Sequence, residues 1–225
     1  MKRLAAKDRK SVVITAGPTR EYIDPVRFLS NESSGRMGFA LAQRAAELGH
    51  KVTLIAGPVC LVTPKGVKRV DVVSARDLLA ATKAEFKNAD ALFMAAAVAD
   101  FRPARKLAGK WRKKDDGSDE ASIALVKNPD VLATVARSKG ERTVIGFALE
   151  TGNGIRRARA KLARKNLDYI ALNDASALNA KKSSVTILGA DGSKLELVQR
   201  PKERIADALL GLLACTESGT NMPRE

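Results

Sequence analysis

Residues 11–17 read SVVITAG, residues 51–56 read KVTLIA, and residues 33–48 between them read SSGRMGFALAQRAAEL. The first and last segments are near-continuous apolar, β-branched runs, which is typical of parallel strands buried on both faces. In the middle segment, apolar residues recur at three- and four-residue spacing from Met37 to Leu48, so they share one helical face. Together the three segments predict a strand–helix–strand unit of a parallel sheet.

The same rhythm continues along the chain. The further elements it predicts are helices at residues 75–87 and 155–165 and strands at residues 91–98, 122–126, 143–148 and 167–172. Another helix is expected to open at Asn128 and Pro129, as N-cap and first helical residue. About six parallel-type strands with intervening helices place the chain in the α/β class, as a Rossmann-like three-layer sandwich with a mostly parallel sheet.

The two ends of the chain read differently. Residues 1–10 form a basic segment, which we expect to be a solvated tail ahead of one domain at residues 11–215. Near the C-terminus, alternating strands at 184–188 and 194–198 flank Asp191-Gly192 and predict a small β-hairpin region. An amphipathic helix at 201–213 and a frayed tail at 216–225 follow.

A basic stretch interrupts the rhythm. Residues 102–120 read RPARKLAGKWRKKDDGSDE and show no apolar period. A loop of this length inside a compact domain is usually functional or disordered. We therefore expect a flap at about residues 101–120 that could close over a polyphosphate, with a solvated charged loop as the alternative.

Composition limits the function classes. The chain has 225 residues, 45% hydrophobic and 29% charged, which describes one globular domain with at most an appendage. Forty Lys and Arg against 25 Asp and Glu give a net charge of +15, which suits nucleic acids or phosphorylated small molecules. Aromatic residues are only 4% and are not interleaved with the basic clusters, so single-strand nucleic-acid binding is disfavoured.

Cysteine and histidine usage excludes several kinds of site. Cys60 and Cys215 form no C-x-x-C pair, which disfavours zinc and redox motifs and suits a reducing, cytoplasmic setting. The only histidine, His50, stands where a helix is expected to end, so histidine-based triads and His-ligated metals are disfavoured. No apolar run approaches the ~18–20 residues of a membrane helix.

Candidate chemistry follows the predicted strands, since ligands of parallel sheets bind beyond the carboxyl ends. Gly17, and then Ser33, Gly35 and Gly38 before the first helix, suggest a phosphate site at a helix N-terminus. Ordinary glycine packing is the alternative, because the pattern is neither GxGxxG nor a P-loop.

Further candidates follow the later strands. Asp100 could hold a magnesium ion that bridges nucleotide phosphates, or cap a loop. Lys161 and Lys165 share one helix face and could reach a triphosphate or face water. Phe147 could pack against a base or belong to the core.

Several long motifs then occur in order across residues 11–215. They are ITAGPTREYIDPVRFLSNESSGRMGFALA (14–42), AAAVADFRP (95–103), KWRK (110–113), VKNPDVL (126–132), GFALET (146–151) and RKNLDYIALND (164–174). In these motifs the chain closely resembles the phosphopantothenate–cysteine ligases of coenzyme A biosynthesis, whose bacterial form is often fused behind a flavin-dependent decarboxylase. A separate decarboxylase is therefore a possible partner of this chain.

The resemblance implies a two-step amide synthesis. The carboxylate of 4′-phosphopantothenate is activated by a nucleoside triphosphate with magnesium, and L-cysteine then displaces the nucleotide. Bacterial members generally use CTP and eukaryotic members ATP; the motif style here is bacterial, so CTP is expected. Family members are dimers, so a homodimer is expected as well.

The resemblance also assigns residues. Asn31 would bind the pantothenate part and the acyl-nucleotide, and Lys110 would be the catalytic first lysine of a K-x-K-K motif, here Lys-Trp-Arg-Lys with Lys114 as an extra neighbour. Arg27 would reach the substrate phosphate in the partner subunit. Substrate residues would further include Ala96, Ala97 and Asp100. The implied nucleotide-binding residues are Gly17, Ser33, Gly35, Gly38, Met94, Ala95, Ala96, Asp100, Lys110, Pro129, Asp130, Val131, Leu132, Phe147, Lys161, Lys165 and Asn173.

The main rival interpretation is an NAD(P)-dependent oxidoreductase of the Rossmann type. The strand–helix–strand opening favours it. Against it, the glycine spacing from residue 17 to residue 38 does not match GxGxxG. The strand at 51–56 also runs into Gly57-Pro58 instead of ending in the acidic residue that would bind a ribose.

Overall fold

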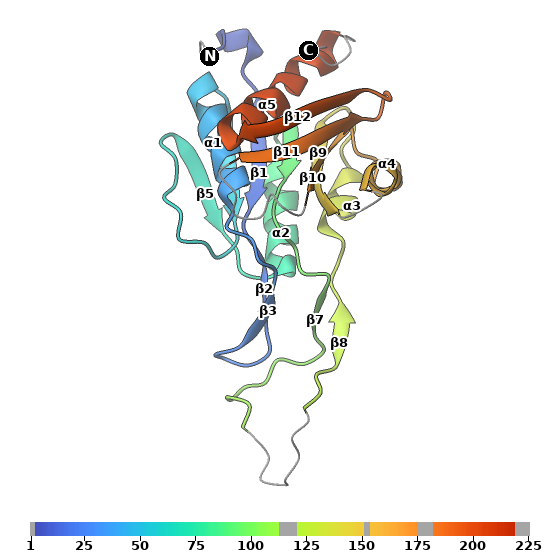
Figure 1. Cartoon of the computed structure of the whole chain (residues 1–225). Coiled ribbons are helices and arrows are strands. Elements are labelled where there is room, and N and C mark those ends of the chain that lie inside the picture. Colours follow the sequence, from blue (N-terminus) through green and yellow to red (C-terminus); the bar gives the residue numbers. More distant parts are fainter. Residues whose placement is uncertain (1–2, 113–120, 151–153, 175–181, 219–225) are drawn as a thin grey trace.

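An eight-stranded sheet forms the centre of the protein, in the order β12-β11-β10-β9-β6-β1-β4-β5 (Figure 1). The computed structural model describes residues 3–112, 121–150, 154–174 and 182–218. The strands are β1 (Ser11–Ala16), β4 (Lys51–Ala56), β5 (Val67–Asp71), β6 (Ala91–Met94), β9 (Thr143–Glu150), β10 (Tyr169–Asp174), β11 (Lys182–Gly189) and β12 (Lys194–Pro201). Neighbouring strands among β10, β9, β6, β1, β4 and β5 pair in parallel. Strand β11 pairs antiparallel with β10, and β12 pairs antiparallel with β11.

Helices cover both faces of this sheet. They are α1 (Arg36–Leu48), α2 (Ala75–Phe86), α3 (Val131–Ala136), α4 (Gly154–Arg164) and α5 (Lys202–Ser218). Residues of α1 and α5 share one hydrophobic cluster with the sheet, and residues of α2, α3 and α4 share a second cluster. The predicted three-layer α/β sandwich with a mostly parallel sheet is therefore confirmed.

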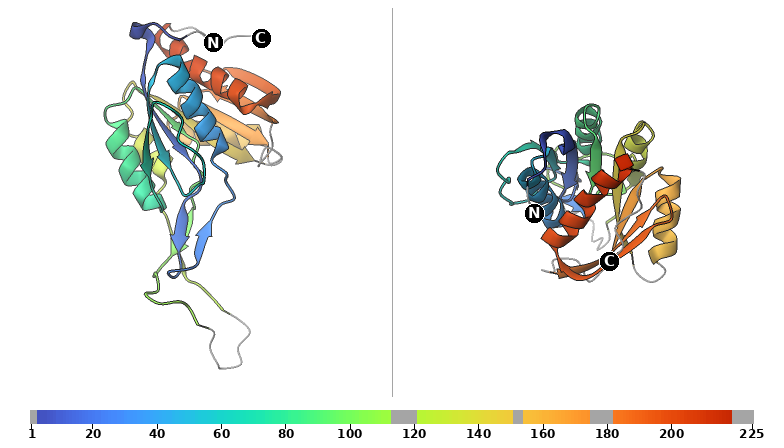
Figure 2. Two further views of the ribbon diagram at one scale, coloured as in Figure 1. Left: turned by 90° about the vertical axis from the view of Figure 1, so that its left-hand side faces the viewer. Right: turned by 90° about the horizontal axis from the view of Figure 1, so that it is seen from above.

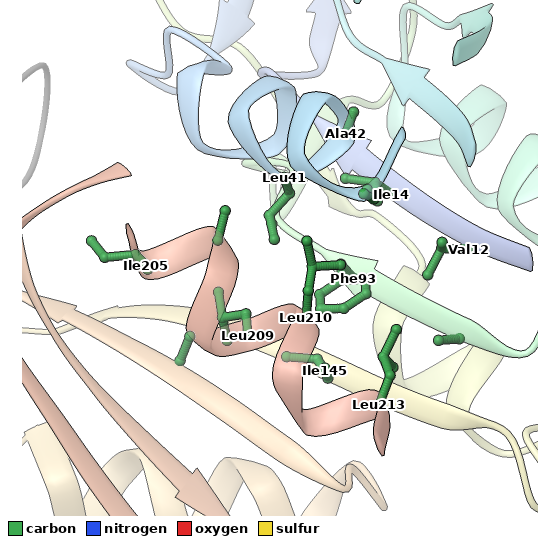
Figure 3. Packing of buried hydrophobic residues seen from close by; sticks show 14 of the residues in the cluster. Val12, Ile14, Leu41, Ala42, Phe93, Ile145, Ile205, Leu209, Leu210 and Leu213 are labelled. Carbon is green, nitrogen blue, oxygen red and sulfur yellow. The ribbon is translucent and has the colours of Figure 1, made fainter. Parts of the chain in front are cut away.

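The core on the α1 side joins segments that are far apart in sequence. Figure 3 shows Leu209 and Leu210 of α5 in the same cluster as Leu41 of α1 and Phe93 of β6. Leu41, Leu209 and Phe93 are fully buried. The C-terminal helix α5 thus packs beside α1 on the same face of the sheet. This packing fixes the positions of the residues at the N-terminal ends of both helices.

Close backbone approach places the start of α1 directly on the end of β1. A Cβ atom built on Gly38 would lie 2.5 Å from the Cβ of Ala16 and 2.9 Å from the carbonyl oxygen of Thr15. A Cβ atom on Gly57 would lie 1.8 Å from the carbonyl oxygen of Pro18. Only glycine fits at these two positions, so the segments that follow β1 and β4 meet in van der Waals contact.

Two antiparallel strand pairs project from the carboxyl edge of the sheet. One pair is β2 (Arg20–Tyr22) with β3 (Phe28–Ser30), and the other is β7 (Phe101–Pro103) with β8 (Leu125–Lys127). Figures 1 and 2 show both pairs extending away from the body of the molecule. We call residues 20–30, 101–112 and 121–127 together the limb.

The limb corrects two sequence predictions. The segment at 122–126 was expected in the parallel series, but β8 pairs with β7 outside the main sheet. The sixth parallel strand is instead β5, which was not predicted because charged residues interrupt its apolar pattern, VKRVD, at the sheet edge. The strand expected at 91–98 ends at Met94, since the chain then leaves the sheet toward β7.

The cap of α3 was also predicted at the wrong residue. Asp130, not Asn128, is the N-cap, and its carboxylate accepts the backbone N–H of Ala133 at 3.0 Å. Pro129 precedes the cap instead of opening the helix. Asn128 is buried, and its amide Nδ2 donates to the carbonyl oxygen of Ala99 at 2.9 Å. It therefore joins β8 to the segment after β6.

The described N-terminal segment and the C-terminal end of α5 lie at the edge of the sheet opposite the limb (Figure 2). The expected solvated tail contains a 3₁₀ turn at Ala6–Asp8, and the N–H of Leu4 donates to the carbonyl oxygen of Leu48. His50 follows the end of α1 as predicted; it is buried, and its Nδ1 accepts the N–H of Lys10 at 2.9 Å. Helix α5 continues to Ser218 instead of fraying from residue 216, and residues 219–225 lie outside the described part.

Candidate functional site

A cavity of about 530 Å³ opens beyond the carboxyl ends of the parallel strands. Its walls come from the segment between β3 and α1 with the first turn of α1, the segment after β6, the end of β9, two residues of α5, and single residues of α4, β10 and β11. This is where ligands of open parallel sheets bind. The predicted site residues that line it are Asn31, Ser33, Gly35, Gly38, Ala95, Ala96, Ala97, Asp100, Phe147, Lys161 and Asn173.

The wall next to α1 presents backbone donors. Gly35 is the N-cap of α1 in the left-handed conformation, with φ of 73°, and no side chain caps the helix. A Cβ atom there would lie 3.2 Å from the backbone nitrogen of Gly17, so these two glycines pack against each other. Gly17 supports the wall from behind without lining the cavity. The first-turn N–H groups of α1 have no partners within the helix and suit an anion.

Buried threonines hold the wall that follows β6. The hydroxyl of Thr15 accepts the N–H of Ala96 at 3.1 Å, and the hydroxyl of Thr19 accepts the N–H of Ala99 at 3.0 Å. Both threonines are buried. The segment therefore leaves the sheet in a fixed direction and ends at the exposed carboxylate of Asp100 at the cavity.

The opposite wall combines an aromatic ring with a cation. Lys161 of α4 is partly buried, and its Nζ donates to the carbonyl oxygen of Phe147 at 3.0 Å. Asn173, near the end of β10, lies on the same side of the cavity. An aromatic face, an amide and a cation at strand ends can together bind a planar polar ring with attached oxygens.

Several predicted nucleotide residues do not line the cavity. Met94 is buried in the sheet, and Val131 and Leu132 belong to the core of α3. Pro129 precedes the α3 cap. Met94, Val131 and Leu132 are buried in the second hydrophobic cluster, so they do not line the cavity.

Asp130 and Lys165 bind each other. The Nζ of Lys165 lies 2.7 Å from the carboxylate of Asp130, and Lys165 is the less exposed partner. Burial would raise the pKa of Asp130, but the hydrogen bond from Lys165 and the N–H of Ala133 outweigh it and lower the pKa. In this structure Lys165 therefore positions α4 against α3 and is not directed into the cavity.

Arg27 and Lys110 lie on the limb, outside the cavity of their own chain. The anchor there is Asp24, whose carboxylate is fully buried and accepts the backbone N–H groups of Arg27 at 2.8 Å and Trp111 at 3.0 Å. The Nη1 of Arg27 donates to the same carboxylate at 2.6 Å and to the carbonyl oxygen of Trp111 at 3.0 Å. Lys110 is exposed, and Lys113 and Lys114 lie outside the described residues.

The hydrogen bonds at this anchor determine its charge state. Burial alone would raise the pKa of Asp24, but three backbone N–H groups and the guanidinium of Arg27 lower it to about 2. The carboxylate thus stays ionised at any ordinary pH. It holds the first half of the predicted flap against the β2–β3 connection.

The sequence missed several cavity residues. Arg36 stands in the quoted motif at 14–42 without an assigned role, and Ser183, Lys202 and Ile205 were not singled out at all. The signal for Arg36 was its place next to Gly35. No local signal marks Lys202, because only the packing of α5 against α1 brings it to the cavity.

The donor set limits the kinds of metal site. Within the described ranges, no group of three or more His, Cys, Asp and Glu side chains could hold a metal ion. Magnesium at a nucleotide site usually takes one or two carboxylates and completes its shell with phosphates and water, and the cavity is lined by two carboxylate residues, Asp100 and Glu32. In the same described ranges, no helix is long and apolar enough to cross a membrane.

Comparison with known proteins places this arrangement in a family. The model of the family described as DNA/pantothenate metabolism flavoprotein C-terminal domain matches residues 7–215. The coenzyme A biosynthesis bifunctional protein CoaBC of Vibrio parahaemolyticus is 46% identical over 206 residues, which are 89% of this chain and 51% of that protein. CoaBC of Escherichia coli K12 is 46% identical over 205 residues, 89% of this chain and 50% of that protein.

A solved structure agrees with these matches. The crystal structure of the C-terminal domain of a coenzyme A biosynthesis bifunctional protein CoaBC superposes with a TM-score of 0.81 at 37% identity. The match covers 94% of this chain and 97% of that one. The chain spans about half the length of the curated relatives it matches, and 97% of this solved domain.

Proposed function

The chain belongs to the family of the DNA/pantothenate metabolism flavoprotein C-terminal domain, and we propose that it is a ligase that joins 4′-phosphopantothenate to L-cysteine in coenzyme A biosynthesis. The observation that carries the proposal is the cavity in which Asn31 and Gly35, Asp100, and Phe147 meet from three separate segments. The relatives named for coenzyme A biosynthesis support the pathway.

The reaction has two steps. A carboxylate oxygen of 4′-phosphopantothenate attacks the α-phosphorus of CTP; the bond from that phosphorus to the bridging oxygen breaks, and pyrophosphate leaves with the electron pair. The amino group of L-cysteine then attacks the acyl carbon of the acyl-cytidylate. The amine loses a proton, the bond from carbon to the nucleotide oxygen breaks, and CMP leaves.

The residues suit this chemistry because 4′-phosphopantothenate, the nucleotide and the acyl-nucleotide are all anions. Transfer at phosphorus depends mainly on positioning and on charge neutralisation, which backbone N–H groups and lysines provide without a histidine. The N–H groups after Gly35 would bind phosphate oxygens, and Lys161 with Phe147 and Asn173 would bind the nucleoside. Asp100 would hold the magnesium ion, which would supply neutralisation of phosphate charge.

The side chain of Asn31 lies exposed at the cavity wall. An amide can donate through its nitrogen and accept through its oxygen, which suits the amide-rich pantothenate part and the acyl-nucleotide. Asn31 would therefore hold the activated acyl group while cysteine approaches.

A homodimer would bring the limb of one subunit to the cavity of the other. Arg27 and Lys110 are outside the cavity of their own chain, yet the family resemblance assigns both to the reaction. A second copy could supply these two cations from its own limb, so that each site would be shared between subunits. Because the relatives are bifunctional proteins, a decarboxylase, fused or separate, is the natural partner for the product.

The test is pyrophosphate release with 4′-phosphopantothenate, L-cysteine, magnesium and either CTP or ATP. Cysteine-dependent amide product with CTP would support the ligase and its nucleotide together. Product with ATP alone would retain the ligase and overturn the proposed CTP preference. Folded protein that turns over neither nucleotide would contradict the proposed activity for this chain.

A further inference from the structure

Two basic side chains of the cavity have no place in the reaction described so far. Arg36 is the first residue of α1 and Lys202 is the first residue of α5, and both line the cavity. The N-terminal ends of two long helices therefore lie at the same cavity, although Arg36 and Lys202 are 166 positions apart in the sequence. The N-terminus of each helix carries a partial positive charge, which adds to the positive charge of the two side chains at the cavity.

The surroundings of Lys202 are unusual for a lysine. Lys202 is partly buried, and its Nζ donates to the hydroxyl of the buried Ser183 at 3.3 Å. Burial lowers the pKa of Lys202, and the positive charge of Arg36 lowers it further, whereas Glu203 raises it. Arg36 is thus the charged residue that disfavours the ammonium form of Lys202.

Neither cation has an ion-pair partner in the described part of the chain. Other partly buried lysines do have one: Lys165 pairs with Asp130 at 2.7 Å, and Lys139 pairs with Asp168 at 2.6 Å. The cationic pair instead leaves positive charge concentrated at the cavity, on the partly buried Lys202 and the exposed Arg36. Such an arrangement is costly until an anion enters, and a phosphate group accepts hydrogen bonds from both cations at once.

We propose that Arg36 and Lys202 bind the β- and γ-phosphates of the nucleoside triphosphate, so that this corner of the cavity is its pyrophosphate subsite. The inference rests on the proposed ligase function and deepens it. The subsite is continuous with the N–H groups after Gly35, which extends one phosphate-binding surface from α1 to α5. Because these two phosphates leave together, the cations also stabilise the charge that grows on the leaving group.

The primary test measures binding of inorganic pyrophosphate to the intact protein by calorimetry. Lys202→Met and Arg36→Met should each weaken it about tenfold, the effect of one lost charge-assisted hydrogen bond. Lys65→Met is the matched control, because Lys65 is exposed in the β4–β5 connection and away from the cavity. Lys202→Arg should retain binding within a few-fold, which separates lost charge from disturbed packing of α5.

Steady-state kinetics then identify which phosphate uses the subsite. Lys202→Met should raise KM for CTP about tenfold and leave KM for cysteine unchanged. A rise in KM for 4′-phosphopantothenate instead would overturn the assignment to the nucleotide. Equal pyrophosphate affinity in wild type and Lys202→Met would overturn the subsite itself. Pyrophosphate binding that depends on Lys202 in a protein without ligase turnover would keep the subsite and refute the ligase function.

Discussion

The cavity wall and the limb carry predicted site residues in opposite ways. The wall is built from strand ends and helix N-termini that the two-sided core holds in place, and it gathers Asn31, Asp100 and Phe147 within one chain. The limb projects from that core, and the segments that carry Lys110 and Arg27 are joined to each other through Asp24 and through the N–H of Leu107, which donates to the carbonyl oxygen of Ile23. The difference shows that a single chain builds the cavity wall, whereas the limb projects away from the body of the molecule and does not line this cavity with Arg27 or Lys110.

The largest expected effect separates the two regions by reaction step. Lys110→Ala on the limb should reduce pyrophosphate release about 10²–10³-fold, because a cation that neutralises developing charge is lost. Asn31→Ala on the wall should still release pyrophosphate but pass little acyl group to cysteine. Lys65→Ala, also an exposed lysine, is the control and should behave as wild type.

Mixing these two variants tests whether a site is shared. If Asn31 and Lys110 act together from different subunits, random exchange restores about a quarter of wild-type activity, since half of the dimers carry one intact site of two. If exchange restores no activity, Asn31 and Lys110 act within one chain's site, and the proposed sharing of the site between subunits is wrong.

The next effect concerns folding stability. Leu209→Ala should lower the free energy of unfolding by about 2–5 kcal/mol, because Leu209 is fully buried between α5, α1 and the sheet. Phe101→Ala on β7 should cost about 0.5 kcal/mol or less, since its ring is 50% exposed. Urea unfolding measures both. Equal losses would show that the limb folds as part of the core.

A smaller effect is expected at the anchor of the limb. Asp24→Asn keeps Lys110 but weakens the hold on Trp111 and Arg27, so activity should fall about tenfold with little change in KM for CTP. Asp71→Asn, which changes an exposed carboxylate paired with Arg69 on β5, is the control. An unchanged rate in Asp24→Asn would show that the anchor does not position the limb.

The anchor also sets an acid limit. The pKa of Asp24 is lowered from 3.8 to about 2, so its contribution to stability is present above pH 3.8 and is lost as pH falls toward 2. Between pH 5 and 8 the Asp24 carboxylate should therefore not titrate, and carbon-detected NMR of this carboxyl group would show it.

The smallest effect is at the far edge of the sheet, where His50 binds the N–H of Lys10. Burial lowers the pKa of His50 below its ordinary 6.5, despite the opposing charge of Asp90. The unfolded chain then takes up the proton first, so stability should decline slightly as pH falls below 6.5 and level off below the folded pKa. Since His50 is the only histidine, one NMR titration measures it, and a pKa above 6.5 would refute the expectation.

Some features were readable from the sequence because local physics carries them. Periodicity gave the alternation of β1, α1 and β4 to within a few residues, and the run after β6 pointed to Asp100. The edge strand β5 was not predicted because charged residues interrupt its apolar pattern. The α3 cap was misplaced because Asn128 is a good cap residue whose buried amide is used for a tertiary hydrogen bond instead.

The sequence by itself determined the class of fold, the family, and the motifs that surround the cavity, because these depend on residue order and on contacts between near neighbours. Only the tertiary structure decided which of those residues face the cavity, that Lys165 is paired with Asp130, and that Lys202 stands beside Arg36. The physical reason is that these relations depend on how α5 and the limb pack against distant segments, and long-range packing leaves no periodic trace in the residues that take part.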